Sequence, residues 1–326
     1  MTTKKLGTRI LGSSGLDITE IGLGLWAAGG DAWGPTDDDE ILSTIDASLD
    51  AGINFYDTAD VYGWDHSENL LGRSMQGRRD QFIVATKIGW RDFDGEAGRT
   101  AYDTVDKLVA GVESNLRRLK TDYVDLIQSH ISYREPTMEV FVEGFKRLQK
   151  EGKVRSYGVS TSDFEYLKAF NADGGCASVQ VDYSILNRTS EADIFPYCQE
   201  NNIGIIIRGA LAMGILTGKF DLDSQFDEGD FRRNWQEKPD EHAMFVDDLA
   251  TVERLRPLAQ DRTLAQLALQ FTLAHPAVTT VIPGAKNRRQ LADNLRAGTL
   301  PPLSAADLAA IDAITPPGGG RKIWPA

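Results

Sequence analysis

The sequence predicts an α/β protein, a (β/α)8 TIM barrel made by a single domain over residues 1–326. Three observations lead to this fold class. Short apolar runs alternate with longer helical patterns from residue 19 to residue 297. Most of the runs are continuous rather than alternating, which is typical of parallel strands covered on both faces. Eight strand–helix units follow one another without a break in composition, as a closed barrel requires.

The competing fold is an open, doubly wound sheet. Such a sheet normally carries GxGxxG at its first strand–helix turn. The first strand here ends in Gly22, Gly24, Leu25 and Trp26, and no tight helix start follows. The closed barrel is therefore favoured.

The elements follow in chain order. A hairpin is expected at residues 8–19, with Ser13, Ser14 and Gly15 as its turn. The eight barrel strands are expected at residues 19–25, 54–57, 82–88, 124–130, 154–160, 178–183, 203–208 and 279–283. Periodic segments between them predict helices at 38–51, 104–119, 138–150 and 264–274.

Three acidic residues, 37–39, stand where the helix at 38–51 begins, and negative charge suits the positive end of a helix. We prefer this interpretation to a metal site, because neither Gly nor Glu follows at the spacing of a calcium loop. The stretch 220–246 is charged, aromatic and aperiodic, and its length is typical of a lid or binding loop. The chain closes with a C-terminal helix and a Pro/Gly tail at 316–326.

Composition excludes several classes of function. Lys and Arg total 35 against 48 Asp and Glu, so the formal charge is −13. Nucleic-acid surfaces and polybasic membrane patches need clustered cations, so neither partner is expected. The N-terminus has no apolar core of a secretory signal, no run approaches the ~20 apolar residues of a membrane span, and we expect a cytoplasmic protein. Cys176 and Cys198 have no metal or redox spacing, which predicts two buried thiols and no metal site.

Catalytic groups of barrel enzymes lie at the C-terminal ends of the strands. Asp57 and Lys87 end adjacent expected strands, and a buried Lys at that place needs a carboxylate partner. Tyr62 follows in DTADVYG, and an ammonium beside it is expected to lower its pKa from ~10 towards neutrality. Tyr62 would then donate a proton to a substrate oxygen that His130 orients. Convergence of four such groups points to a site rather than to four unrelated structural roles.

The sequence resembles the aldo-keto reductase superfamily from about residue 11 to about residue 298, in spelling closest to the bacterial aldo/keto reductases and the potassium-channel β-subunits. The matching pieces are GLDITEIGLGLW (15–26), DAGINFYDTADVYG (50–63), ATK (85–87), VDLIQSH (124–130), YGVS (157–160), Gln180, LAMGILTGK (211–219) and IPGAKNRRQLADN (282–294). The resemblance implies a catalytic tetrad of Asp57, Tyr62, Lys87 and His130.

The resemblance also implies NADP(H), with NAD(H) as the alternative, bound across the barrel mouth without a Rossmann motif. Ser160 and Gln180 would hold the nicotinamide carboxamide, residues 211–219 would follow the pyrophosphate, and residues 284–294 would take the 2′-phosphate and adenine. The residues implied in cofactor binding are Trp26, Asp57, Ser160, Gln180, Arg208, Gly209, Leu211, Gly214, Leu216, Gly218, Lys219, Pro283, Gly284, Ala285, Lys286, Gln290 and Asn294. The residues themselves support part of this, because Lys286, Arg288 and Arg289 stand where a helix begins, a favourable place for an anion. A solvated helix face is the alternative.

Two positions depart from the family pattern. Thr161 stands where many members have Asn, which affects one carboxamide contact. Arg208 stands where many members stack a Tyr on the nicotinamide, and its guanidinium can stack too while adding positive charge. We therefore expect a bias towards the reduced cofactor.

The leading hypothesis is an NADPH-dependent reductase of aldehydes or ketones, working on a small carbonyl or alcohol substrate in a pocket walled by Trp26, Trp64 and Trp90. The alternative is a redox-sensing barrel that holds cofactor and turns over slowly. A two-carboxylate hydrolase has little support, since Asp57 is the only acidic strand-end residue. Substrate identity, reaction direction and oligomeric state stay open.

Overall fold

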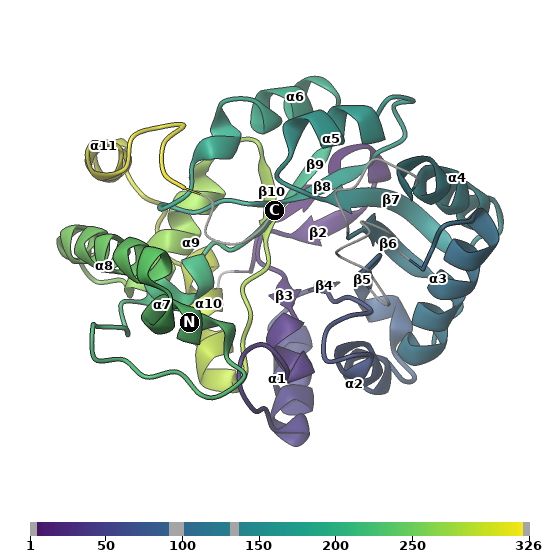
Figure 1. Ribbon diagram of the computed structural model, residues 1–326, viewed down its shortest axis with the longest axis horizontal. Coiled ribbons are helices and arrows are strands. Elements are labelled where there is room, and N and C mark those ends of the chain that lie inside the picture. Colours follow the sequence, from purple (N-terminus) through teal and green to yellow (C-terminus); the bar gives the residue numbers. More distant parts are fainter. Residues whose placement is uncertain (1–4, 91–100, 131–136, 322–326) are drawn as a thin grey trace.

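The computed structural model describes residues 5–90, 101–130 and 137–321. Eight parallel strands form one sheet in which every strand lies beside its neighbours in the chain (Figure 1). These strands are β3 (Leu23–Gly24), β4 (Phe55–Asp57), β5 (Ile83–Ile88), β6 (Val124–Ser129), β7 (Val154–Ser160), β8 (Ser178–Asp182), β9 (Gly204–Arg208) and β10 (Val278–Val281).

The sheet closes on itself between its first and last strands. Ile21 and Gly24 form parallel bridges with Val281 and Gly284. The amide of Gly22 donates to the carbonyl of Val281 at 2.8 Å, which continues the ladder across the seam. The predicted (β/α)8 barrel is confirmed.

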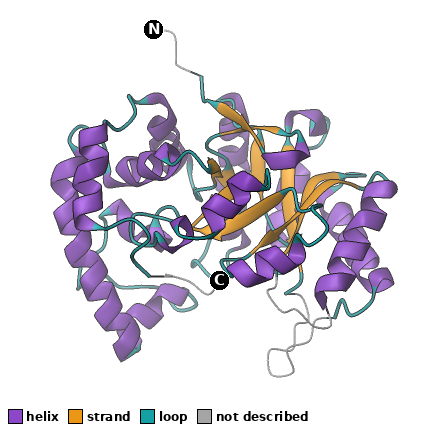
Figure 2. Cartoon of the chain, turned by 90° about the horizontal axis from the view of Figure 1, so that it is seen from above, coloured by secondary structure: helices purple, strands orange, loops and turns teal. Residues whose placement is uncertain are grey.

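Helices surround the strands (Figure 2). The helices are α1 (Asp38–Asp50), α2 (His66–Ser74), α3 (Val105–Leu119), α4 (Thr137–Lys150), α5 (Phe164–Phe170), α6 (Ile194–Glu200), α7 (Asn234–Glu237), α8 (Pro239–Ala259), α9 (Leu264–Ala274), α10 (Arg288–Thr299) and α11 (Ala305–Ile314). Asp37 caps α1 by accepting from the amide of Glu40, so the acidic run serves a helix start as expected. Helices α7 and α8 are additions to the repeat, and α8 packs against α9 and α11.

The predicted hairpin is present and closes the lower end of the barrel. Strands β1 (Thr8–Ile10) and β2 (Asp17–Thr19) pair antiparallel, and Gly15 turns the chain in the left-handed region. Gly12 lies so close to the start of β9 that an added Cβ would stand 2.2 Å from the amide nitrogen of Gly204. Only glycine permits this approach, which seats the hairpin against the strands.

Most expected elements agree with the structure to within a few residues, and two differ. The expected first strand at 19–25 is divided, because residue 19 belongs to β2 and only Leu23–Gly24 remain in β3. The long expected loop at 220–246 contains α7 and the start of α8. Both cysteines are buried. None of the described helices combines the length and apolar character needed to cross a membrane.

Candidate active site

Inside the barrel, the side chains of four strands change from apolar to polar between positions two residues apart. Because side chains alternate, residues two apart on a strand face the same way. An apolar cluster fills the lower layer and includes two residues of the hairpin; it consists of Leu11, Ile18, Phe55, Ala85, Leu126, Ile206 and Ile282. Two residues further along β4, β5, β6 and β9 come Asp57, Lys87, Gln128 and Arg208. The layer of polar side chains therefore lies directly against a layer of apolar side chains.

Lys87 is the centre of this polar layer. Its Nζ donates to Asp57 Oδ1 at 2.5 Å, to the carbonyl of Thr58 at 2.9 Å and to the hydroxyl of Tyr62 at 3.0 Å. The side chain of Lys87 is 0% exposed and that of Asp57 is 3% exposed. A buried ammonium is stable here because all three of its hydrogens have acceptors and one acceptor is charged.

Two glutamines hold the other oxygen of Asp57. Gln180 donates from Nε2 to Asp57 Oδ2 at 2.8 Å, and Gln128 does so at 3.3 Å. The carboxylate is thus fixed from three strands, which orients it towards Lys87. The sequence interpretation placed Gln128 at the end of an expected strand but gave it no role in the site. The side-chain nitrogen of Gln180 is therefore already hydrogen-bonded within this network.

The expectation for the pKa of Tyr62 is wrong in direction. Burial raises the pKa of the phenol above 10.0, and this effect exceeds the opposing one of the Lys87 ammonium. The pKa of Lys87 is raised too: burial would lower it, but Asp57 and Tyr62 more than compensate. Both groups therefore hold their protons at neutral pH.

His130 completes the predicted group. Its ring lies edge-on to Tyr62, with centroids 5.8 Å apart. Burial and the cations Lys87 and Arg208 hold its pKa well below 6.5, so the imidazole is neutral. Among the described residues, no group bonds to His130 Nδ1. A neutral imidazole beside the phenol can donate a hydrogen bond to a ligand or accept one from it.

An aromatic stack supports Tyr62 from the side. The rings of Trp26 and Tyr62 stack at 5.7 Å, and Phe231 stacks on Trp26 at 5.9 Å with an interplanar angle of 6°. Trp33 meets both Trp26 and Phe231 edge-on. Trp33 and Phe231 were missed by the sequence interpretation, and the stretch 220–246 that contains Phe231 was the only signal for it.

The other two predicted wall residues lie differently from Trp26. Trp64 is 59% exposed and Trp90 is 38% exposed. Trp64 and the following Asp65 have positive φ values of 48° and 85°. Strained backbone of this kind persists where the surroundings hold it, often at functional sites.

Arg208 and Ser160 stand on the same rim, on β9 and β7. Arg208 Nη2 lies 3.5 Å from Ser162 Oγ. Its positive charge slightly opposes the rise in the pKa of Tyr62 and contributes to the lowered pKa of His130. Ser160 pairs with Gln180 in the β7–β8 ladder. The strand ends thus bring Arg208, Ser160 and Gln180 to the same mouth as Tyr62.

The segment after β9 has an unusual backbone. Ala212, Met213 and Gly214 all have positive φ values, of 48°, 55° and 98°. The amides of Ala212 and Gly214 donate to the carbonyls of Gly209 and Leu211 at 2.7 and 2.9 Å, so these residues form a tight, internally hydrogen-bonded turn. The predicted residues Gly209, Leu211, Leu216 and Gly218 belong to or flank this segment.

Cations gather beside this segment. Burial and the neighbouring charges of Arg232 and Lys286 lower the pKa of Lys219, and burial and Arg232 lower that of Lys286. Arg232 is already paired with Asp230. Lys286 Nζ donates to the carbonyl of Trp33 at 2.6 Å, a neutral acceptor. Within the part of the chain that the structure describes, Asp230 and Asp227 lie near enough to favour the charged lysines, but neither Lys219 nor Lys286 forms an ion pair, which fits a phosphate-bearing ligand.

Helix α10 begins where the sequence predicts a helix start, with Asn287 as its N-cap. Gln290 accepts from the amide of Lys286 at 2.8 Å, and Asn294 donates to the carbonyl of Gly284 at 3.2 Å. These contacts fix the segment that contains Pro283, Gly284 and Ala285.

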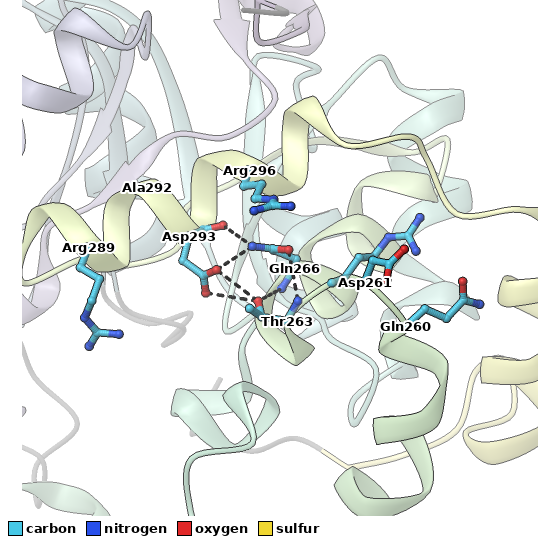
Figure 3. Close-up of a pocket in the computed structure, with 9 residues that line it drawn as sticks. Gln260, Asp261, Thr263, Gln266, Arg289, Ala292, Asp293 and Arg296 are labelled. Atoms are coloured by element: carbon cyan, nitrogen blue, oxygen red, sulfur yellow. Dashed lines mark hydrogen bonds between the residues drawn. The ribbon is translucent and has the colours of Figure 1, made fainter.

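A cavity of about 560 Å³ lies beside this segment, between α10 and the loop before α9. Its lining residues are Gln260, Asp261, Arg262, Thr263, Gln266, Arg289, Ala292, Asp293 and Arg296. Figure 3 shows Asp293 hydrogen-bonded to Thr263 and Gln266, which joins α10 to α9. Gln290 and Asn294 are not among the lining residues, so the cavity borders the predicted adenosine positions rather than coinciding with them.

Comparisons with known proteins lead to one family. The aldo/keto reductase family matches residues 20–316. "Aldo-keto reductase YhdN" of Bacillus subtilis is 35% identical over 86% of this chain and 85% of its own. The structure of the glycerol dehydrogenase AKR11B4 from Gluconobacter oxydans is similar with a TM-score of 0.80, 30% identity, and 96% and 95% of the two chains covered. An aldo-keto reductase from Klebsiella pneumoniae in complex with NADPH gives a TM-score of 0.70 at 26% identity, with 96% of each chain covered.

Proposed function

The chain belongs to the aldo/keto reductase family, and from that premise we propose that it reduces an aldehyde or ketone to the alcohol with NADPH, with Tyr62 as the proton donor. Family membership makes it an NAD(P)H-dependent oxidoreductase. The observation that carries the finer proposal is the buried contact of Tyr62 with the Lys87–Asp57 ion pair.

Tyr62 is suited to donate rather than to accept a proton. Burial keeps its phenol protonated at neutral pH. Lys87 lies 3.0 Å from the phenol oxygen and stabilises the phenolate that remains after donation. Asp57 keeps Lys87 charged and in place. The proton passes from Tyr62 to the substrate oxygen, and His130 orients that oxygen through a hydrogen bond.

The residues on the rim fit the cofactor. The nicotinamide, when bound, supplies the hydride to the carbonyl carbon. Ser160 and the oxygen of Gln180 would hold its carboxamide, the segment at 212–214 would lie along the pyrophosphate, and Lys286 would take the 2′-phosphate. Support comes from the lowered pKa values of Lys219 and Lys286, because neighbouring cations and burial disfavour their charges and a bound anion would favour them.

Arg208 would favour one direction of the redox reaction. A guanidinium at the nicotinamide would repel the positive charge that appears on oxidation. The reduced cofactor is then bound in preference, and reduction is the favoured direction.

A substrate panel tests the proposal. Oxidation of NADPH is followed with aldehydes and ketones, and reduction of NADP⁺ with the matching alcohols, each repeated with NADH or NAD⁺. The proposal expects steady turnover of at least one carbonyl with NADPH. Tight NADPH binding with no turnover of any carbonyl or alcohol would favour the redox-sensing alternative.

A further inference from the structure

Ser67, the second residue of α2, is a buried polar residue to which the proposed reaction assigns no role. Its side chain belongs to a residue that is 0% exposed. Its hydroxyl donates to the carbonyl of Leu25 at 2.8 Å, and the same oxygen lies 2.8 Å from Thr58 Oγ1. Because a serine hydroxyl has only one hydrogen, Thr58 is the donor in the second hydrogen bond. A chain of two hydrogen bonds therefore runs from Thr58 through Ser67 to Leu25.

One end of this chain lies against the ammonium of the candidate active site. The carbonyl of Thr58 accepts from Lys87 Nζ at 2.9 Å and is one of the three acceptors of that group. The amide of Thr58 donates to the carbonyl of Ala85 at 2.9 Å, while its hydroxyl bonds to Ser67. Thr58 is thus held to β5 through its backbone and to α2 through its side chain. Both contacts fix the direction in which its carbonyl points.

The other end of the chain reaches the aromatic support of Tyr62. Leu25 directly precedes Trp26, whose ring stacks on that of Tyr62 with centroids 5.7 Å apart. In addition, the backbone amide of Ser67 donates to the carbonyl of Tyr62 at 3.2 Å. Ser67 therefore bonds to the segment that carries the phenol and to the segment that carries its stacking partner.

We propose that Ser67 is a positioning residue for the reaction, whose hydroxyl holds the Thr58 carbonyl in place so that Lys87 stays directed at the Tyr62 phenol. The contact of Lys87 with Tyr62 gains most importance as the phenolate forms, so its displacement should act on kcat more than on binding. The inference rests on the proposed role of Tyr62 as the donor.

Ser67→Ala deletes the hydroxyl and keeps the backbone bond to Tyr62. Misplacing a catalytic group by ~1 Å can cost on the order of 100-fold in rate, and we expect kcat for carbonyl reduction to fall about tenfold. KM and the dissociation constant of NADPH should stay within about twofold, because the fully buried Ser67 is not accessible to a ligand. The solvent deuterium isotope effect on kcat should rise, because proton donation becomes slower relative to the other steps.

Ser74→Ala is the matched control, since it removes a second buried serine hydroxyl from the same helix. Ser74 is 6% exposed, and its hydroxyl donates to Asp46 Oδ1 at 3.1 Å. Both alanine variants should have a lower melting temperature than wild type. Only Ser67→Ala should have a lower kcat and a larger isotope effect when both are measured well below their melting temperatures.

Substitutions of Thr58 test the same chain from its other end, and they serve equally well if Ser67→Ala does not fold. Thr58→Val keeps the shape of the side chain and removes the hydroxyl, so it should lower kcat as Ser67→Ala does. Thr58→Ser restores the hydroxyl and should recover most of that loss. The double variant of Ser67→Ala and Thr58→Val should lose no more kcat than either single variant, because both remove the same chain.

Three results would overturn the inference. They are a wild-type kcat in folded Ser67→Ala or Thr58→Val, equal losses of kcat in Ser67→Ala and Ser74→Ala, and losses that multiply in the double variant. Full activity of Tyr62→Phe would instead overturn the proposed function, so the two failures are distinguishable.

Discussion

The two halves of the site are built in opposite ways. In the catalytic half, on β4, β5, β6 and β8, the charged groups are paired and fully hydrogen-bonded. Lys87 has three acceptors, and Asp57 accepts from Lys87 and from two glutamines. In the cofactor half, after β9 and β10, Lys219 and Lys286 repel each other, and neither forms an ion pair among the residues that the structure describes. The catalytic half is therefore arranged without a ligand, and we expect the proposed cofactor half to gain stability from one.

Removing the hydroxyl of Tyr62 should give the largest effect. Tyr62→Phe keeps the ring stack on Trp26 and deletes the proton donor, so kcat for reduction should fall about 100- to 10,000-fold. NADPH binding, measured by fluorescence titration, should stay within about twofold. Tyr56→Phe, which removes the neighbouring buried phenol on β4, should keep activity. A Tyr62→Phe enzyme within about threefold of wild type would show that the catalytic half works in another way.

The next largest effect is expected in the cofactor half. Lys286→Ala should weaken NADPH binding about 10- to 100-fold and NADH binding much less, because only NADPH carries the 2′-phosphate. Dissociation constants for both cofactors measure this directly. Arg254→Ala is the control, since it removes an exposed cation of α8 that lies outside the predicted site. Equal losses for the two cofactors would remove Lys286 from the phosphate site.

Arg208 lies where the two halves meet. Two unit charges at ~4 Å and an effective dielectric of ~20 repel by ~4 kcal/mol, and screening reduces this to a preference of about tenfold for NADPH over NADP⁺. Arg208→Tyr keeps a stacking plane and deletes the charge, so the ratio of the two dissociation constants should move towards one. If intrinsic tryptophan fluorescence gives the same ratio for both proteins, Arg208 does not act through its charge.

The smallest effect concerns support of the catalytic half by the long loop. Phe231→Ala removes the ring behind Trp26, and an aromatic pair is worth ~0.5–1.5 kcal/mol. We expect kcat to fall about two- to tenfold, with recovery in Phe231→Tyr. Phe226→Ala, in the same loop but packed on Phe220 and Trp235, should leave kcat unchanged. An equal loss in both alanine variants would mean that the loop matters only for folding.

The same contrast explains what the sequence could reveal. The tetrad was predictable because Asp57 and Lys87 end adjacent strands and Tyr62 follows within a few residues, so that barrel geometry alone brings them together. Phe231 was not, because its contact with Trp26 joins residues 205 positions apart, and the aperiodic sequence of the loop does not predict its path. The predicted direction of the pKa shift of Tyr62 was wrong for a related reason. The neighbouring cation can be identified in the sequence, whereas the degree of burial, which raises the pKa, cannot.

The closing seam of the barrel has a consequence for how the chain folds. Glu20 and Thr280 are hydrogen-bonded across it although they are 260 positions apart, and the Ile21–Val281 bridge has the same separation. Contacts of such long range form slowly, because the entropy of closing the loop is lost before the contact is gained. The seat of Gly12 against Gly204 also needs residues synthesised much later. During synthesis, one edge of β3 therefore stays unpaired until β10 has been made. An unpaired strand edge favours association with other chains during this interval.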